Sequence, residues 1–240
     1  RQRQMCIRDS VDFVTSVEWN ERETLMKVAF PTVLHSSRAR FDIQFGSMER
    51  PTTKNPSWEY AKFESVGHKW ADLSESGYGA ALMNDSKYGY DVHDGVLRLT
   101  LLKSSNHPDY TADAGLQEFT YSLLLHEGEW YEANVDRESW ELNDPPIVFQ
   151  GSAQLPALFP AELPGVTFDA VKPAEDGKAL ILRLHEKEGR HTSVSIPTAF
   201  PFRSWCECNL LERLDGEAHS GKKVQLTLRP FELKTIKFVL

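Results

Sequence analysis

Residues 94–102 read DGVLRLTLL, and this stretch decides the fold. The dipeptide Asp94-Gly95 supplies the positive φ angles that a two-residue β-hairpin turn requires. The apolar run from Val96 to Leu102 is short and leucine-rich, which is typical of a strand buried on both faces. The stretch therefore predicts a hairpin whose second strand lies in a hydrophobic core.

Alternating apolar and polar residues recur on both sides of this hairpin. Residues 25–30 alternate until Pro31 ends the run, and Val224, Leu226 and Leu228 share one face of a later run. A period of two indicates strands that pack one face on a core. Both runs are therefore predicted to be half-buried strands.

The last run of the chain changes phase. Phe231 and Leu233 share one phase, whereas Ile236 and Phe238 take the other. A bulge near Thr235 accounts for this change, and so does a strand end that is buried on both faces.

The fold class follows from the spacing of these runs. Turn signals separate them at intervals of about ten residues, which is typical of sandwiches. Residues 57–73 form the main helical candidate, but Val66 and Gly67 interrupt it and its apolar positions fit a helical period poorly. The sequence predicts an all-β protein, with a large β-sandwich followed by a smaller C-terminal β-sandwich.

Proline indicates the domain limits. Five prolines fall within residues 143–164, which is too many for a central strand. We expect a large sandwich at residues 11–150, a connection at 151–164 and a small sandwich at 165–240. Residues 1–10, RQRQMCIRDS, have neither the apolar core of a signal peptide nor a periodic pattern, so we expect a disordered or non-native leader, such as translated adapter sequence.

The charge balance excludes two classes of partner. Asp and Glu outnumber Lys and Arg by 35 to 27, giving a net charge of -8. Such a surface offers no basic face for nucleic acid or for an anionic membrane. No apolar run approaches the roughly 20 residues that a membrane span needs. We expect no nucleic-acid and no membrane partner.

The cysteines favour a reducing compartment. Cys6, Cys206 and Cys208 are odd in number, and the Cys-x-Cys spacing is poorly placed to bridge itself. We therefore expect a cytoplasmic protein without disulfides. With His219, Cys206 and Cys208 offer three metal ligands but no fourth, so we favour small buried side chains over a metal site.

Polar and aromatic residues cluster at residues 50–72, 84–90 and 103–109. Trp and Tyr rings pack on sugar faces while Asn, Asp and Lys bind hydroxyl groups, so these loops suit a carbohydrate site.

A structural interpretation of the same clusters is favoured from composition alone. Asn84 and Asp85 can begin a turn through side-chain bonds to the backbone, and Gly89 can supply a positive φ. Trp58 and Trp70 can belong to the core.

No catalytic residue is predicted within the chain. The nucleophile-elbow, Walker, HExxH and GxGxxG motifs do not occur. His68, His107 and His126 are scattered single residues. Carboxylates are numerous, but a sequence does not place a pair at the ~5–5.5 Å that retaining glycoside hydrolysis requires.

A family likeness covers essentially everything after Ser10. Residues 50–90, RPTTKNPSWEYAKFESVGHKWADLSESGYGAALMNDSKYGY, closely resemble the carboxy-terminal region of glycoside hydrolase family 38 α-mannosidases, most of all the cytosolic and bacterial type. The likeness extends to VEWNERETLMKVAFP at 17–31, GVLRLTLLKSS at 95–105, HPDYTADAGLQEFTYSLLLHEGEW at 107–130, LLERLDG at 210–216 and PFELKTIKF at 230–238.

The resemblance implies a retaining exo-α-mannosidase acting on mannose-containing oligosaccharides. Family members carry the Asp nucleophile and a divalent metal, usually zinc, in an amino-terminal (β/α) barrel that is missing here. The resemblance therefore implies a carboxy-terminal fragment with no cofactor of its own, whose partner is that barrel and which is inactive alone.

The same resemblance implies that the hairpin at residues 84–103 contributes to the rim of the active site. The substrate-binding candidates are Asn84, Asp85, Lys87, Tyr88 and Lys103. Relatives often have Arg where this chain has Lys103, and an ammonium keeps the charge but loses the planar two-pronged geometry.

Two other function classes stay open at this point. One is a free-standing, non-catalytic carbohydrate-binding β-sandwich with Trp58, Trp70 or Tyr88 lining an exposed groove; the other is a purely structural interaction module. The mannosidase hypothesis differs from both, because it predicts an apolar face on the larger sandwich that this chain leaves bare.

Overall fold

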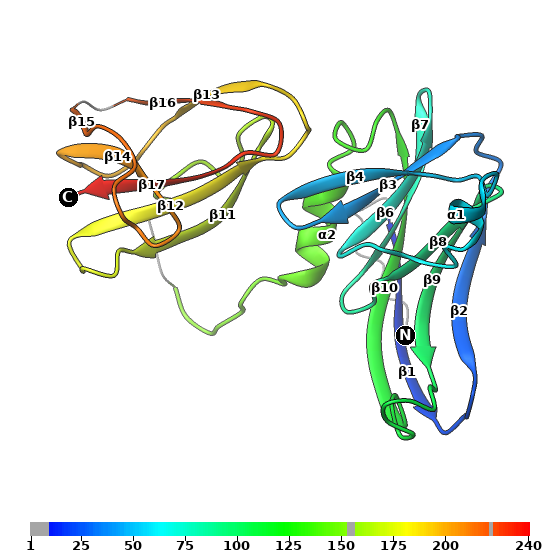
Figure 1. The fold of residues 1–240 in the computed structure, drawn as a ribbon. Coiled ribbons are helices and arrows are strands. Elements are labelled where there is room, and N and C mark those ends of the chain that lie inside the picture. The colour runs from blue at the N-terminus through cyan, green and yellow to red at the C-terminus, as the bar shows by residue number, and fades with distance from the viewer. Residues whose placement is uncertain (1–9, 153–156, 221–222) are drawn as a thin grey trace. The chain divides into compact units, whose positions relative to one another are not determined.

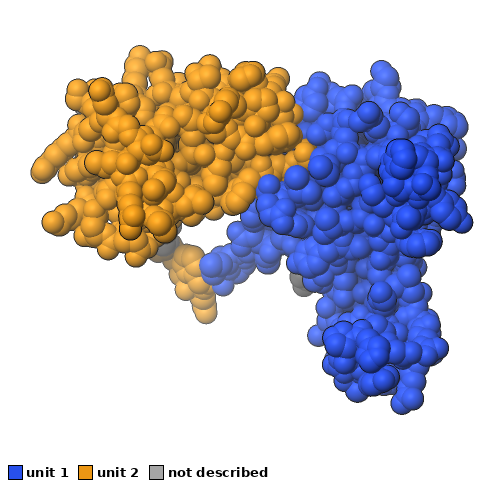
Figure 2. Space-filling model, viewed as in Figure 1, with its two compact units in different colours: residues 1–44, 48–148 blue, residues 45–47, 149–240 orange. Residues whose placement is uncertain are grey.

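A computed structural model describes residues 10–152, 157–220 and 223–240, and these residues form an all-β protein as predicted (Figure 1). They divide into two compact units (Figure 2). Unit 1 comprises residues up to 44 together with 48–148, and unit 2 comprises 45–47 together with 149–240. Residues 1–9 of the expected leader lie outside the described residues, and the first strand begins at Ser10.

Unit 1 is a sandwich of two antiparallel sheets. One sheet has the strand order β1 (Ser10–Trp19), β10 (Gly115–Glu127), β7 (Tyr78–Asn84), β6 (Trp70–Glu75), β3 (Arg38–Ile43) and β4 (Gly46–Pro51). The other has the order β2 (Leu25–Pro31), β9 (Val96–Lys103), β8 (Gly89–His93) and β5 (Ser65–Val66).

The DGVLRLTLL stretch forms the predicted hairpin between β8 and β9. Asp94 and Gly95 have φ values of 54° and 71°, and His93 pairs directly with Val96. Leu97 and Leu99 are fully buried in the core between the two sheets.

The expectation that β9 is buried on both faces is wrong. Its residues alternate between buried and half-buried up to Thr100. The pairing with β2 then shifts, because Met26 opposes Leu102 and Lys27 opposes Thr100. Leu101 is the extra residue of this bulge, which lets both Leu101 and Leu102 pack in the core.

The helix α2 (Val135–Asn143) was not predicted from the residue pattern. It buries Val135 and Ser139 and packs against β6 and β7. With only two buried residues, α2 has no clear helical period of apolar residues in the sequence. Of the rejected candidate at 57–73, only the turn α1 (Ser57–Tyr60) is helical.

Unit 2 is a smaller antiparallel arrangement. Its larger sheet has the order β11 (Val166–Pro173), β12 (Ala179–Glu186), β17 (Leu233–Val239), β14 (Ser204–Cys208) and β15 (His219–Ser220), and β13 (Thr192–Ile196) pairs with β16 (Val224–Leu228). Val224, Leu226 and Leu228 are buried on one face of β16 as predicted.

The phase change in the last run is not caused by a bulge. β17 pairs without a register shift with both β12 and β14. Phe231 lies in the preceding turn with a φ of 57°, so it does not belong to the strand. Thr235 and Ile236 are both buried, on opposite faces. The alternative expectation, burial on both faces, is therefore confirmed.

No helix among the described residues is long and apolar enough to cross a membrane.

Candidate functional site: the outer face of the four-stranded sheet

Asn84 holds the turn that follows β7. Its side chain is 1% exposed. The amide Nδ2 donates to the carbonyl of His68 at 2.9 Å and to the hydroxyl of Tyr90, and Oδ1 accepts from the N–H of Lys87 at 2.6 Å. The amide is therefore engaged within the chain, as the structural interpretation predicts.

Asp85 ties the same turn to β10. Its Oδ2 accepts from the N–H of Thr120 at 2.8 Å, and its own N–H donates to the Thr120 carbonyl at 3.1 Å. Oδ1 accepts from the hydroxyl of Ser86 at 2.8 Å. Both carboxylate oxygens thus have partners beside the turn.

Tyr88 and Lys103 are exposed, whereas Lys87, like Asp85, is half-buried. The Lys87 ammonium lies 4.5 Å from the centre of the Phe119 ring, a cation–π contact. Tyr88 is 56% exposed and meets His68 edge to face. Lys103 is exposed at the end of β9, where its backbone N–H donates to Asp113 at 2.7 Å.

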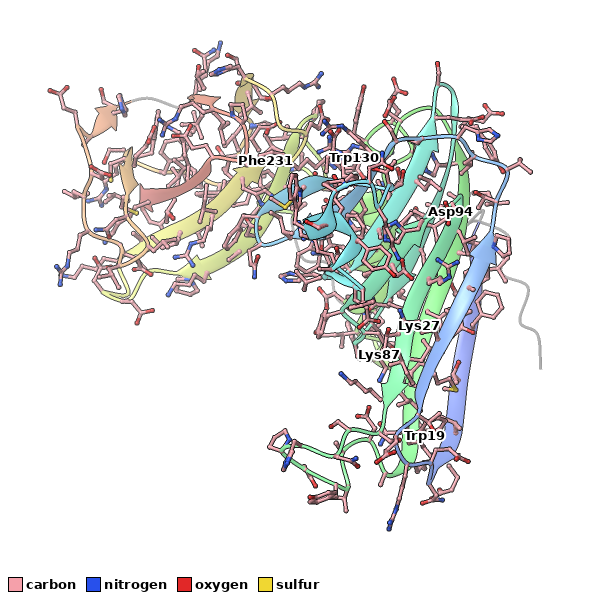
Figure 3. All side chains as sticks on the ribbon, turned by 45° about the vertical axis from the view of Figure 1, so that its right-hand side comes forward. Trp19, Lys27, Lys87, Asp94, Trp130 and Phe231 are labelled. Atoms are coloured by element: carbon pink, nitrogen blue, oxygen red, sulfur yellow. The ribbon has the colours of Figure 1, made fainter. Side chains whose placement is uncertain are left out.

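A polar network covers the face of the four-stranded sheet that points away from the core. The Lys27 ammonium lies 2.8 Å from Glu64, which also accepts from the hydroxyl of Thr100. Asp91 lies 3.4 Å from Arg98 and 3.9 Å from Lys27. Three strands thus contribute charged groups to one surface, on which Lys27 is labelled in Figure 3.

Lys103 contributes to this network through the effect of its charge on Glu64. Burial alone would raise the pKa of Glu64, but the hydrogen bonds from Lys27 and Thr100 and the charges of Lys27 and Lys103 hold that pKa below its usual value. Glu64 is therefore a carboxylate surrounded by cations and a hydroxyl.

Gly89 connects Tyr88 to the network. A Cβ at position 89 would meet Thr100 at 3.3 Å and Glu64 at 3.5 Å, so the backbone approaches these side chains closely. The expected positive φ at Gly89 is wrong, because the residue is the first of β8 and its φ is not positive. Glu64 and Thr100 thus lie beside the backbone of Gly89, the residue that follows Tyr88, while Asn84 and Asp85 of the preceding turn bond to other parts of unit 1.

Sequence reasoning missed Glu64 and Lys27. Glu64 precedes a strand of only two residues, β5, which gives it no periodic context. Lys27 stands among the alternating residues of β2, where it looked like an ordinary solvent-facing charge. Only the strand pairing brings the two together, and the sequence carries no local signal of it.

The three aromatic candidates fall into two groups. Trp70 is 1% exposed and stacks on Trp130 with ring centres 5.1 Å apart, so it is a core residue. Trp58 and Tyr88 are exposed. Trp70 therefore does not line an exposed groove, and Trp58 does not belong to the core.

A shallow pocket lies beside the network. Glu59, Glu64, Asp91 and His93 contribute to its wall. Arg50 also lines it, donates to the carbonyl of Val66 and lies 4.5 Å over a core ring, and burial lowers its pKa. These charged groups already have partners inside the chain, which limits what the pocket can bind.

The described residues contain no group of three His, Cys, Asp or Glu side chains arranged to hold a metal ion. Cys206 and Cys208 are free thiols in β14, and both are buried. His219 stacks on Trp205 with ring centres 4.3 Å apart. Burial raises the pKa of both thiols, which keeps them protonated.

Comparison with protein-family models gives two matches. Residues 8–111 match the glycosyl hydrolases family 38 C-terminal domain, and residues 165–236 match the glycosyl hydrolases family 38 C-terminal beta sandwich domain.

Individual proteins agree with these matches. Alpha-mannosidase 2C1 of Homo sapiens is 39% identical over 96% of this chain, which covers 23% of that protein. Alpha-mannosidase G of Dictyostelium discoideum is 40% identical over 95% of the chain, which covers 22% of its length. The chain thus spans about a quarter of these relatives.

A solved structure has the same fold. The crystal structure of an alpha-mannosidase from Enterococcus faecalis V583 superposes with a TM-score of 0.78 at 20% identity, over 96% of this chain and 27% of that one.

Proposed function

Because the chain belongs to the carboxy-terminal region of glycosyl hydrolase family 38, we propose that it is the non-catalytic part of a retaining α-mannosidase that hydrolyses terminal α-mannosides. The observation that carries this proposal is the identity of 39–40% over nearly the whole chain with proteins named alpha-mannosidase. The catalytic carboxylates belong to the amino-terminal part of such a protein.

The role proposed for this chain is to support a catalytic barrel and to line the rim of its active site. Tyr88 and Lys103 are the residues proposed to contact the sugar directly, since both are exposed. A tyrosine ring packs on a sugar face, and an ammonium donates to hydroxyl groups. Asn84, Asp85 and Lys87 position that surface, because each already has a partner within the turn or on β10.

We also propose that the catalytic domain binds a divalent metal ion, and that this ion is zinc. The described residues of this chain do not fit such a group, so no step is assigned to them. A chelator should abolish the activity of the full-length protein without changing the thermal unfolding of this chain.

The domain limits at 11–150 and 165–240 and a cytoplasmic location are also proposals. The buried free thiols Cys206 and Cys208 support a reducing compartment. Recovery of the full-length protein in a secreted fraction would contradict the location.

The test of the main proposal is an assay of the full-length polypeptide with a chromogenic α-mannoside. We expect release of mannose with retained anomeric configuration, and no hydrolysis of the matching β-mannoside. A full-length protein that is folded and metal-loaded but hydrolyses no α-mannoside contradicts the proposal.

A carbohydrate-binding sandwich is the second candidate, and the exposure of Trp58 and Tyr88 favours it. It predicts heat on calorimetric titration of this chain with mannose oligosaccharides. The mannosidase proposal expects no such heat, because a rim supplies only part of a binding site.

A further inference from the structure

We propose that an aromatic turn in unit 1 is the surface on which this chain docks against the catalytic part of its own polypeptide. The aromatic turn consists of Trp58, Tyr60 and Phe63. The proposal rests on the function proposed above, and it names a contact surface that the site residues do not include.

The aromatic turn is exposed although its side chains are large and apolar. Trp58, Tyr60 and Phe63 are 68%, 66% and 71% exposed. The helical turn α1 that carries the first two buries no residue at all. Together the three side chains expose on the order of 400 Å² of largely apolar surface to solvent.

Hydrogen bonds of polar groups nevertheless fix the conformation of the aromatic turn. Glu59 lies between the two exposed rings of α1 and accepts a hydrogen bond from Thr53 at 3.1 Å. The N–H groups of Tyr60 and Ala61 donate to the carbonyls of Pro56 and Ser57 at 3.0 Å. The carboxylate thus faces the chain while the rings face outward, the reverse of an ordinary surface helix.

Glu64 anchors the other end of the aromatic turn. It directly follows Phe63 and is fixed by Lys27 at 2.8 Å and by Thr100. A patch whose ends are pinned loses little conformational entropy on binding, which favours its use as a preformed interface.

The occupant we infer is the catalytic part rather than a sugar. The relatives that this chain matches are about four times longer than the matched region, so most of such a polypeptide lies outside the structure. Aromatic residues are enriched at the cores of protein interfaces. A sugar site needs placed polar groups beside its rings, and here Arg50, Glu59 and Glu64 already bond within the chain.

Hydroxyl-radical footprinting with mass spectrometry tests the proposal without any substitution. We expect Trp58, Tyr60 and Phe63 to be labelled in this chain. In the full-length protein the extent of their labelling should be at least about five-fold lower, because interface cores exclude water. Tyr78, the first residue of β7 and 40% exposed, is the matched control. Equal labelling of the aromatic turn in both proteins overturns the proposal.

Other occupants give distinct results. Protection of the turn in this chain by mannose oligosaccharide, or concentration-dependent protection together with dimers in light scattering, also overturns it. The α-mannosidase activity of the same full-length sample tests the proposed function separately. An active protein with an unprotected turn contradicts only the docking surface, and a protected turn in a protein without mannosidase activity contradicts only the function.

Discussion

At the scale of single residues, we propose different roles for Asn84, which supports the fold, and Lys103, which contacts the substrate. Asn84 is buried and bonds to three groups of its surroundings, whereas Lys103 is exposed at a strand end. Substitution of a buried amide leaves its partners unsatisfied, while an exposed ammonium can be removed at little cost in stability.

We therefore expect Asn84→Ala to lower the free energy of unfolding of this chain by about 2–3 kcal/mol. Urea denaturation followed by tryptophan fluorescence measures this. A loss below about 0.5 kcal/mol, the usual range of surface changes, would contradict the structural role.

Lys103→Ala should leave the stability of the chain unchanged and lower kcat/KM of the full-length protein roughly ten-fold or more, since a charge-assisted hydrogen bond is lost. Lys103→Arg is the control and should retain activity, because the positive charge stays in place. An unchanged kcat/KM in Lys103→Ala removes this residue from the rim.

A buried histidine gives unit 1 a pH dependence. Nε2 of His126 lies 2.8 Å from Asp72, which also accepts from the hydroxyl of Ser74. Burial, the largest single influence, lowers the pKa of His126, but the hydrogen bond and charge of Asp72 and the nearby backbone together raise it above 6.5.

The unfolded chain keeps this histidine near its ordinary value of about 6.5. The pair therefore stabilises unit 1 fully below that pH, and the contribution is lost as the pH rises through the folded-state value. We expect His126→Gln to reduce the fall in unfolding free energy between pH 6 and pH 9. Parallel pH curves for both proteins would show that the pair contributes nothing.

The role of a residue could be predicted from the sequence only where that role depends on the residue's own side chain. The turn-forming action of Asn84 follows from its own side chain, and its bond to the N–H of Lys87 confirms it. The network around Glu64 depends on the pairing of β2, β9 and β8, which local sequence does not encode.

At the scale of elements, a single carboxylate organises the turns of unit 2. Glu186 is fully buried at the end of β12. Its oxygens accept from the backbone N–H groups of Glu188, Gly189 and Phe231 at 3.0, 2.8 and 3.0 Å. Two turns distant in sequence are thereby joined at one acceptor.

Glu186→Gln replaces one acceptor oxygen by a donor that faces backbone N–H groups. We expect a loss of about 2–4 kcal/mol in the stability of unit 2, because buried donors are left unsatisfied. Glu217→Gln, at an exposed position, is the matched control and should change nothing measurable. Equal stability of the two variants in urea would contradict the role of Glu186.

Elements with a strong local signal were predictable, and those stabilised by tertiary packing were not. The hairpin at Asp94-Gly95 is encoded by its turn residues, which alone satisfy the φ requirement. The bulge at Leu101 and the short helix α2 form because of what they pack against, so alternation and periodicity did not reveal them.

At the scale of the whole molecule, the two units have separate hydrophobic cores. Units with their own cores can unfold as separate cooperative steps. We expect two calorimetric transitions, with Asn84→Ala shifting one and Glu186→Gln shifting the other. A single transition that both variants shift equally would contradict separate folding units.

The fold class and the family could be predicted from the sequence, because the strand pattern and the family likeness both extend over long stretches of the chain. The function of the surface was less accessible, since Trp58 and Trp70 are alike in sequence and differ only in burial. Exposure is a property of the packed chain, and a composition argument treats both residues in the same way.

We propose that this chain supports sugar cleavage without performing it. The most direct measurement compares α-mannoside hydrolysis by this chain and by the full-length protein at equal molar concentration, with divalent metal present. We expect turnover by the full-length protein and none by this chain. Release of mannose by the chain alone would contradict the proposal.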